Sequence, residues 1–260
     1  MFMNNSINEI QKTNQTRVER EKDWHNQTFG SNARQKTDKF YFIFPLIRQE
    51  QNKKIAQNLH QETTVFLDYG CGNGYDLIER ASKIKKGIGI DISEALINHA
   101  QKKATAENAD NLEFLVMDAT NTTFENNSFD TIRGQAILHH LDLKKSLKEI
   151  KRILKSDGKA FFLEPLDTNF LIKLYRKLTP EARTADEQPL RKKDIRLIKT
   201  LFPKADINYY FCLSLLAVPF RNYKIFGTIL SALHAVDNII LHKYSPLKNL
   251  AWYCSIELKN

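Results

Sequence analysis

The sequence contains few cysteines. Cys71, Cys212 and Cys254 are the only three among 260 residues, and none of their separations matches a paired metal-binding or redox motif. This scarcity argues against a disulfide framework and against a zinc site, and no metal is expected. The N-terminus is rich in Asn and Gln and lacks the apolar segment of a secretory signal, so a reducing cytoplasm is the expected compartment.

Long apolar runs are also scarce. The longest, residues 225–241, contains His234 and Asp237 and is too short and too polar to span a bilayer. Packing against a core is the usual explanation of an apolar helix face, and a lid, a dimer contact or a helix on a membrane surface are the alternatives. The face is predicted from apolar residues that recur here at helical spacing: Phe226, Ile229, Leu230, Leu233, Val236 and Ile240.

Acidic residues are outnumbered, with 30 Asp and Glu against 39 Lys and Arg, which gives a formal net charge of +9. A basic chain can bind nucleic acid or an anionic membrane. Here the bases are interleaved with acids along the chain, and the local excess lies at residues 191–204. The charge is therefore interpreted mainly as a solvated surface, and nucleic acid is the less favoured partner.

What the sequence does contain is a glycine-rich turn. A short apolar segment that reads as a buried strand leads into Asp68, Gly70, Gly72 and Gly74 at alternate positions, and a helix-forming segment follows. Such a unit points backbone N–H groups and a helix N-terminus at a ligand. The third glycine of a dinucleotide fingerprint would fall at Tyr75, so the pattern argues against a nicotinamide cofactor.

Two further predicted strands also lead into aspartate. Residues 86–91 end in Asp91, which lies 21 residues after Gly70, and residues 112–117 are followed by Asp118. The carboxyl ends of parallel strands meet at one edge of a sheet, where ligands bind, and an acid near this spacing binds ribose hydroxyls in dinucleotide-binding proteins. Three acids at successive strand ends therefore predict a nucleoside-binding edge.

The chain from residue 64 alternates predicted strands and helices. We expect strands at residues 64–68, 86–91, 112–117, 128–133, 158–164, 205–212 and 250–258, and helices at about 74–85, 93–107 and 143–155. This alternation predicts an α/β fold with a Rossmann-like, seven-stranded, mostly parallel sheet covered by helices on both faces. Ser93 is the expected N-cap of the second helix, and Gly158 the expected stop of the third.

The remaining segments are expected to decorate this domain. Residues 1–60 are interpreted as an N-terminal helical cap, in which Pro45 marks a helix break or start and Tyr41 and His25 are candidates to face the cleft. Residues 61–260 form the main domain, with insertions at 166–203 and 213–249. No internal repeat or low-complexity tract interrupts it.

The glycine motif, the acid at Asp91, and the segments 134–141 and 162–165 together resemble the class I S-adenosylmethionine-dependent methyltransferases. The likeness is closest to the small-molecule methyltransferases called type 11. It covers residues 60–165 with motifs and the whole chain in layout. The resemblance implies S-adenosylmethionine as cofactor and a terminal antiparallel hairpin formed by the last two strands.

The resemblance also implies how the methionine end of the cofactor is bound. The backbone of Gly70, Cys71 and Gly72 would hold the methionine moiety, with Asp68 near its ammonium group. Gln135 would lie beside the sulfonium. Cys71 stands where such families often have a small residue such as Ala, and a buried thiol behaves as a small apolar group.

The nucleoside end is implied by the same resemblance. Asp91 would bind the ribose hydroxyls and Ile92 would pack on the adenine. The adenine amino group would donate to Asp118, and the Ala119 N–H would reach a ring nitrogen. For each acid alone, a helix N-cap is the plain structural alternative.

Three residues are candidates for the chemistry. His139 and His140 follow the fourth strand, and either would serve as a base or position the acceptor, because neutral His suits proton removal near pH 7. Packing at a helix start is an equal alternative. Glu164 ends the fifth strand and is expected at the rim of the cleft, where it would pair with a cationic acceptor, steady a histidine, or be a surface carboxylate.

The sequence thus predicts methyl transfer to an O, N or C nucleophile of a small, partly apolar metabolite of natural-product type. An RNA or protein methyltransferase and a non-catalytic cofactor-binding module are the alternatives. Residues 134–137 lack the two prolines found after the fourth strand of nucleic-acid amino methyltransferases, which argues against base amino methylation. The acceptor and the oligomeric state are left open.

Overall fold

The computed structural model describes residues 16–28, 42–179, 187–243 and 245–260. They contain a seven-stranded sheet with the order β3-β2-β1-β4-β5-β7-β6. The first five strands run parallel, whereas β7 is antiparallel to both β5 and β6. The predicted fold class and the terminal antiparallel hairpin are therefore confirmed. The strands are β1 (Val65–Tyr69), β2 (Lys86–Asp91), β3 (Leu112–Val116), β4 (Phe129–Gln135), β5 (Leu154–Pro165), β6 (Asp206–Tyr210) and β7 (Tyr253–Lys259).

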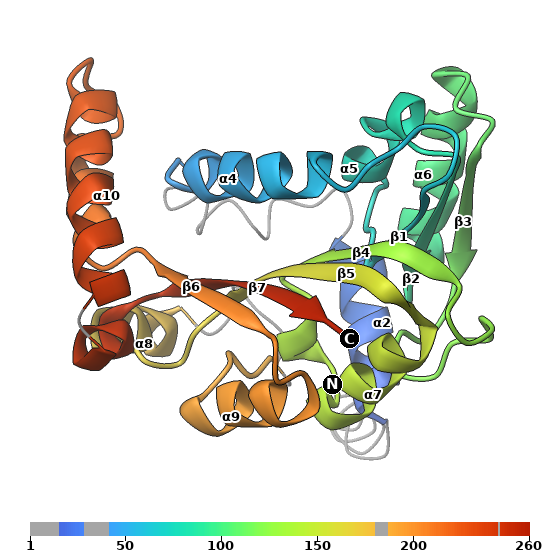
Figure 1. The fold of residues 1–260 in the computed structure, drawn as a ribbon. Coiled ribbons are helices and arrows are strands. Elements are labelled where there is room, and N and C mark those ends of the chain that lie inside the picture. Colours follow the sequence, from blue (N-terminus) through green and yellow to red (C-terminus); the bar gives the residue numbers. More distant parts are fainter. Residues whose placement is uncertain (1–15, 29–41, 180–186, 244) are drawn as a thin grey trace, which may run out of the picture.

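Helices lie on both faces of the sheet (Figure 1). α4 (Phe44–Ala56), α5 (Tyr75–Ile78) and α6 (Glu94–Ala106) lie on one face. α7 (Leu143–Ile153), α8 (Phe170–Leu178) and α9 (Lys192–Leu201) lie on the other. α2 (Arg17–Thr28) contacts α6, and α10 (Phe226–Lys243) stands at the β6 edge. Short 3₁₀ turns complete the described chain: η2 (Ala81–Lys83), η3 (Leu138–His140), η5 (Leu213–Phe220) and η6 (Ser245–Leu250).

The alternation of side chains along each strand builds a core on both faces. On β1, Leu67 and Tyr69 pack in one cluster with Ile150 of α7. Phe66, the residue before Leu67, points the other way and packs in a second cluster with Ile97 of α6. The sheet is thus buried on both sides, which leaves the ends of its strands as the places where a ligand can enter.

Several helix ends were predicted, and the expected stop of the third helix was wrong. Ser93 caps α6 as expected, because its hydroxyl accepts from the backbone N–H of Leu96 at 3.3 Å, and Pro45 lies in the first turn of α4. Gly158 does not end α7. The helix ends at Ile153 and β5 begins at the next residue, since Leu154 already pairs with β4.

The C-terminal insertion forms α10, and its predicted apolar face mostly packs against the core. Leu230 is buried, Phe226 and Leu233 pack on the cluster that contains α4, and Val236 remains 42% exposed. Asp237 is fully buried, and its carboxylate accepts from the backbone N–H groups of residues 212–214, which ties α10 to the start of η5. No helix within the described residues is long and apolar enough to cross a bilayer.

Candidate functional site

The glycine turn after β1 is built from three residues with left-handed backbone. Gly70, Gly72 and Gly74 have φ values of +77°, +54° and +74°, which favour glycine. A Cβ on Gly70 would lie 2.8 Å from the side chain of Ile137, and one on Gly74 would lie 2.7 Å from Phe114. A Cβ on Gly72 would meet nothing within 4 Å. Gly70 and Gly74 therefore serve packing, while Gly72 faces open space.

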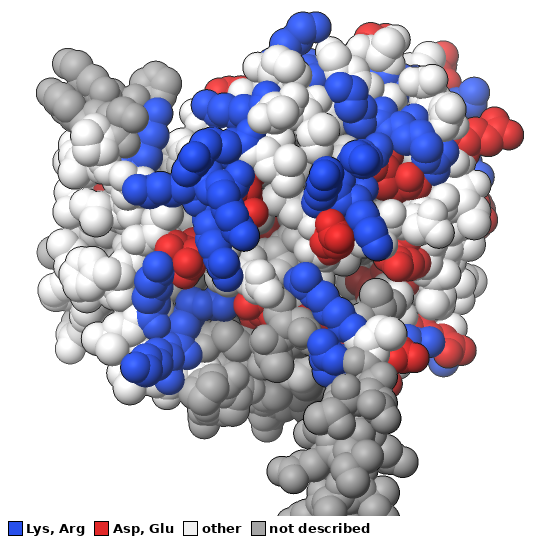
Figure 2. Space-filling view, turned by 90° about the horizontal axis from the view of Figure 1, so that it is seen from below, with Lys and Arg blue, Asp and Glu red and all other residues white. Residues whose placement is uncertain are grey.

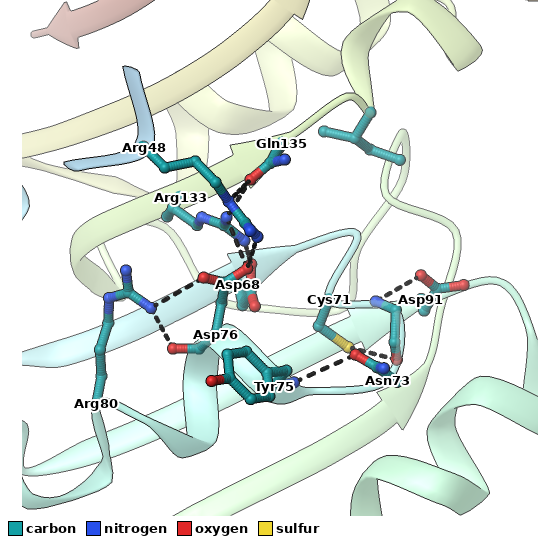
Figure 3. A network of polar contacts seen from close by, with 12 residues as sticks. Arg48, Asp68, Cys71, Asn73, Tyr75, Asp76, Arg80, Asp91, Arg133 and Gln135 are labelled. Carbon is teal, nitrogen blue, oxygen red and sulfur yellow. Dashed lines mark hydrogen bonds and ion pairs between the residues drawn. The ribbon is translucent and has the colours of Figure 1, made fainter. Parts of the chain in front are cut away.

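Asp91 is tied to this turn at the end of β2 (Figure 3). Its Oδ2 accepts from the Gly72 N–H at 3.0 Å and its Oδ1 from the Ser93 N–H at 2.9 Å. The carboxylate is half-buried, and Ile92 beside it is partly exposed. The N–H groups of Gly72 and Ser93 thus fix the orientation of the Asp91 carboxylate beside the glycine turn, where the sequence predicted a ribose site.

Asp118 and Ala119 follow the neighbouring strand, β3. Asp118 is partly exposed, and its Oδ1 accepts from the Thr120 N–H at 2.8 Å and the Thr120 hydroxyl at 2.9 Å. The carbonyl of Ala119 accepts from the hydroxyl of buried Tyr69. Because β3, β2 and β1 are adjacent in the sheet, the three predicted acids lie at the carboxyl ends of three neighbouring strands.

Asp68, which we expect near the ammonium group of the methionine moiety, is paired with an arginine inside the core. Its side chain is fully buried, and its Oδ1 accepts from Arg133 Nη1 of β4 at 3.2 Å. Oδ2 has no hydrogen-bond partner among the described residues. Burial raises the pKa of this carboxyl group, against the opposing effect of the Arg133 guanidinium. Asp68 therefore lies behind the turn as the partner of a buried arginine.

Arg133 joins Asp68 to a wider ionic network (Figure 3). Its Nη2 lies 2.8 Å from Asp76 Oδ2 and donates to Gln135 Oε1 at 2.8 Å. Arg48 of α4 reaches the same two groups, at 3.2 Å from each. Burial raises the pKa of Asp76, but the surrounding arginines outweigh it and lower the pKa overall. Gln135, predicted beside the sulfonium, is thus held between two guanidinium groups.

Glu164 and His139 form a buried pair beneath the end of β4. Glu164 is fully buried rather than at the rim of a cleft, and its Oε2 lies 2.7 Å from His139 Nδ1. Its Oε1 accepts from the N–H groups of Ile137 and Leu138 at 3.0 and 2.9 Å. Of the roles predicted for Glu164, steadying a histidine agrees with this position, whereas a surface carboxylate does not.

The environment of His139 favours its neutral form. Burial and then the neighbouring His140 lower its pKa, and these effects outweigh the opposing carboxylate of Glu164. A neutral ring that donates from Nδ1 to Glu164 carries its lone pair on Nε2. The two histidine rings lie side by side, with centroids 4.2 Å apart.

Two acids from distant segments complete this histidine cluster. His140 Nδ1 lies 3.1 Å from Glu21 Oε2 of α2, and His139 Nε2 lies 3.7 Å from Glu187 Oε1. His139, His140 and Glu187 each bring a ligand-type atom within 4.8 Å of the others. Arg176 Nη1, however, lies 2.8 Å from the same Glu187 oxygen. A guanidinium already neutralises this acid, so the cluster is better described as a buried charge network than as a metal site.

Sequence reasoning missed the charged partners at this end of the sheet. Arg48, Asp76 and Arg133 were not singled out, nor were the two acids beside the histidines. Arg133 had a signal, because a charged residue inside a central strand must find a buried partner. The sequence carried no comparable signal for Glu21 and Glu187, since these acids come near the two histidines only when the N-terminal helix and an insertion fold back over the sheet. Tyr41 and the side chain of His25 lie outside the described part of the chain.

Comparisons with known proteins agree on one family. A family model described as a methyltransferase domain matches residues 66–158. The chain is 37% identical over 102 residues to a demethylmenaquinone methyltransferase of Lactococcus lactis, which covers 38% of this chain and 40% of that protein. It is 35% identical over 104 residues to the aklanonic acid methyltransferase DauC of a Streptomyces species, covering 38% and 47%. The chain thus spans less than half the length of these curated relatives.

Solved structures share the fold over more of the chain. The geranyl diphosphate C-methyltransferase of Streptomyces coelicolor, determined with Mg²⁺, geranyl diphosphate and S-adenosyl-L-homocysteine, aligns with a TM-score of 0.57 at 12% identity. The alignment covers 82% of this chain and 79% of that one. The matched domain holds the glycine turn and the three strand-end acids described above. The comparisons therefore identify residues 66–158 as a methyltransferase domain, in a chain that shares the fold of that solved methyltransferase.

Proposed function

We propose that the chain transfers a methyl group from S-adenosylmethionine to an O, N or C nucleophile of a small, partly apolar acceptor. The observation that carries this proposal is the joint placement of Gly72 and Asp91. Gly72 faces open space, and its N–H holds the Asp91 carboxylate at the mouth of the turn. A nucleoside with two ribose hydroxyls suits an acid fixed in this way, because hydrogen bonds to an ionised acceptor are strong.

The residues around the turn fit the rest of the cofactor. Asp118 and Ile92 are partly exposed at the neighbouring strand ends, which suits the adenine. Arg48 is 44% exposed and contacts Gln135, so it would place a positive charge near the carboxylate of the methionine end. Asp68 would act through Arg133 from behind the turn. The bound cofactor supplies an activated methyl group on a sulfonium.

The protein's own contribution is to position the acceptor and accept its proton. For a hydroxyl or ammonium acceptor, we propose His139 as the base, acting through Nε2, with Glu164 as the residue that positions it. The proton would be gained at Nε2, and the resulting imidazolium would lie between the carboxylates of Glu164 and Glu187, which stabilise its charge. His140 would help position the acceptor. In-line attack then requires only that the nucleophile be held near the methyl group.

The acceptor class rests on supporting indications. The curated relatives are named for demethylmenaquinone and for aklanonic acid, both small molecules. We therefore place phenolic and hydroquinone compounds first in a panel of acceptors. An RNA or protein acceptor and cofactor binding without catalysis are the alternatives, and both are compatible with the same cofactor pocket.

Isothermal titration tests the cofactor step. We expect S-adenosylmethionine and S-adenosylhomocysteine to bind and NAD to give no heat. Asp110→Ala, which removes an exposed acid ahead of β3, serves as a matched control for variants of the strand-end acids. Binding of NAD, or of none of the three, would contradict the proposal. Transfer of a labelled methyl group is then followed across the panel, with transfer RNA included as the competing acceptor.

A further inference from the structure

The outer side of α8 carries four large apolar residues that no part of the described chain covers. Phe170, Leu171, Leu174 and Leu178 are 65%, 52%, 55% and 71% exposed. With 3.6 residues per turn, they fall within an arc of about 100° around the helix axis. Folded proteins rarely leave a contiguous apolar face of this kind in water unless it binds something.

The rest of α8 fixes this face in its outward orientation. Ile172, on the opposite side of the helix, is 5% exposed and belongs to the core. Asn169 caps the helix by accepting from the Ile172 N–H at 3.1 Å, and its side-chain amide donates to the Leu250 carbonyl at 2.6 Å. The Thr168 hydroxyl donates to the Ala251 carbonyl at 3.0 Å. The helix is therefore anchored at its start, and its apolar side is a fixed part of the surface.

Positive charges flank this apolar face. Lys173 and Lys177 are exposed along one border of the arc. Long lysine stems of this kind lie along an apolar surface while the ammonium groups stay in water. Phe and Leu on one side with lysines at the border is the composition of helices that lie in a membrane interface.

The neighbouring helices extend the positive charge. α7 and α9 lie beneath the sheet with α8, and Figure 2, seen from that side, shows Lys and Arg gathered over much of the face. The exposed bases of α7, of α9 and of the residue before α9 are Lys144, Lys145, Lys148, Lys151, Arg191, Lys192, Lys193, Arg196 and Lys199.

We propose that the outer face of α8 binds the surface of an anionic lipid bilayer, with its four apolar side chains among the acyl chains. The basic face of α7 and α9 would lie against the lipid headgroups. Charge complementarity identifies this occupant, because an exposed base near an anionic membrane strengthens binding by about fivefold. The proposal concerns where the protein binds and does not depend on the proposed methyl transfer.

Two other occupants explain only part of the surface. Nucleic acid would match the bases of α7 and α9, but its phosphates gain nothing from the exposed leucines of α8. A second copy of the chain would cover the leucines, but it would bring a second set of bases against the first. A bilayer with acidic headgroups satisfies both parts of the surface at once.

Co-sedimentation with lipid vesicles tests the proposal on the full chain. We expect binding to vesicles of phosphatidylcholine mixed with phosphatidylglycerol, weaker binding to phosphatidylcholine alone, and a decline in affinity as salt is raised. The double variant Leu171→Ser and Leu174→Ser should bind the mixed vesicles about tenfold or more weakly, because two apolar side chains are lost from the contact. Lys173→Glu with Lys177→Glu should weaken the preference for the anionic lipid, because two of the bases that face the headgroups become acids.

Matched variants at the other end of the sheet serve as controls. Val116→Ser alters an exposed apolar residue of β3, and Lys102→Glu alters an exposed base of α6, and both should bind vesicles like the wild type. Thermal unfolding confirms that every variant is folded. The proposal is overturned if the α8 variants bind like the wild type or if acidic lipid makes no difference. It is also overturned if RNA binds while vesicles do not, or if the leucine variant merely dissociates a dimer.

Discussion

Replacing Glu164 by Gln tests how His139 is held. The amide keeps the shape of the carboxyl group, and its oxygen can still accept from the N–H groups of Ile137 and Leu138. Its nitrogen only donates, so it cannot accept from His139 Nδ1, which lies 2.7 Å from Glu164 Oε2. The imidazole proton should therefore move to Nε2, and the lone pair that we assign to proton removal is lost.

Two magnitudes follow from this geometry. Losing one charge-assisted hydrogen bond should lower the free energy of unfolding by about 1.5–3 kcal/mol in Glu164→Gln. Glu164→Ala also leaves the two backbone donors without an acceptor and should cost about 3–5 kcal/mol. Turnover of an acceptor that needs a base should fall by about 10²–10⁴-fold in the Gln variant, while S-adenosylmethionine affinity stays within about twofold.

Urea unfolding, with the exposed-site variant Glu62→Gln as control, measures the stability change. Nuclear magnetic resonance of the imidazole nitrogens reports the tautomer and the pKa of His139. That pKa should fall further in Glu164→Gln, because the carboxylate that favours the imidazolium has been removed. An unchanged tautomer together with a stability loss below about 0.5 kcal/mol would refute the reasoning.

Three further predictions concern the cofactor edge and the buried charges. Asp91→Ala should weaken S-adenosylmethionine binding by about tenfold or more in isothermal titration, and an unchanged affinity would show the ribose assignment to be wrong. Arg133→Met leaves Asp68 buried without its guanidinium and removes one of the guanidinium groups around Asp76, so urea unfolding should show a loss of about 3–5 kcal/mol, and a loss below about 1 kcal/mol would contradict the network. Burial and His140 lower the pKa of His139, so its stabilising contribution is present above about pH 6.5 and is lost as the pH falls through the folded-state pKa. His139→Gln should therefore reduce the difference between the urea midpoints at about pH 7.5 and about pH 5.5, and an undiminished difference would assign the acid sensitivity to another group.

The strand-end acids show what a sequence can predict. Short apolar segments followed by Asp68, Asp91 and Asp118 were enough to predict the first three strands and their common edge, because strand burial and turn chemistry are local properties. The hydroxyl of Ser93 was recognisable as a helix cap for the same reason. The terminal hairpin came from the family resemblance.

The partners of these residues were less predictable. Asp68 was expected near the ammonium group of the cofactor, but its ion pair with Arg133 of another strand was not predicted. The first helix was expected over 74–85, but α5 ends at Ile78. The Asp76 carbonyl accepts from the side chain of Arg80, and the backbone N–H of Arg80 donates to the Leu77 carbonyl rather than to that of Asp76, so the helical pattern of hydrogen bonds stops there. Such choices depend on which side chains reach across the fold, which local patterns do not encode.

The place of β7 in the sheet has a consequence for how the molecule assembles. β6 bonds to the sheet through β7 alone, and β7 reaches β5 only after residues 166–252 have been traversed. Closing so long a loop is slow, because the chain loses conformational entropy when the loop ends meet, before the contacts between β7 and β5 have formed to offset that loss. We therefore expect β1 to β5 to fold first. The segment from α8 to α10 should dock later, as one cooperative unit that is fixed in place when β7 pairs with β5. A protease added during refolding should accordingly cut first within that segment.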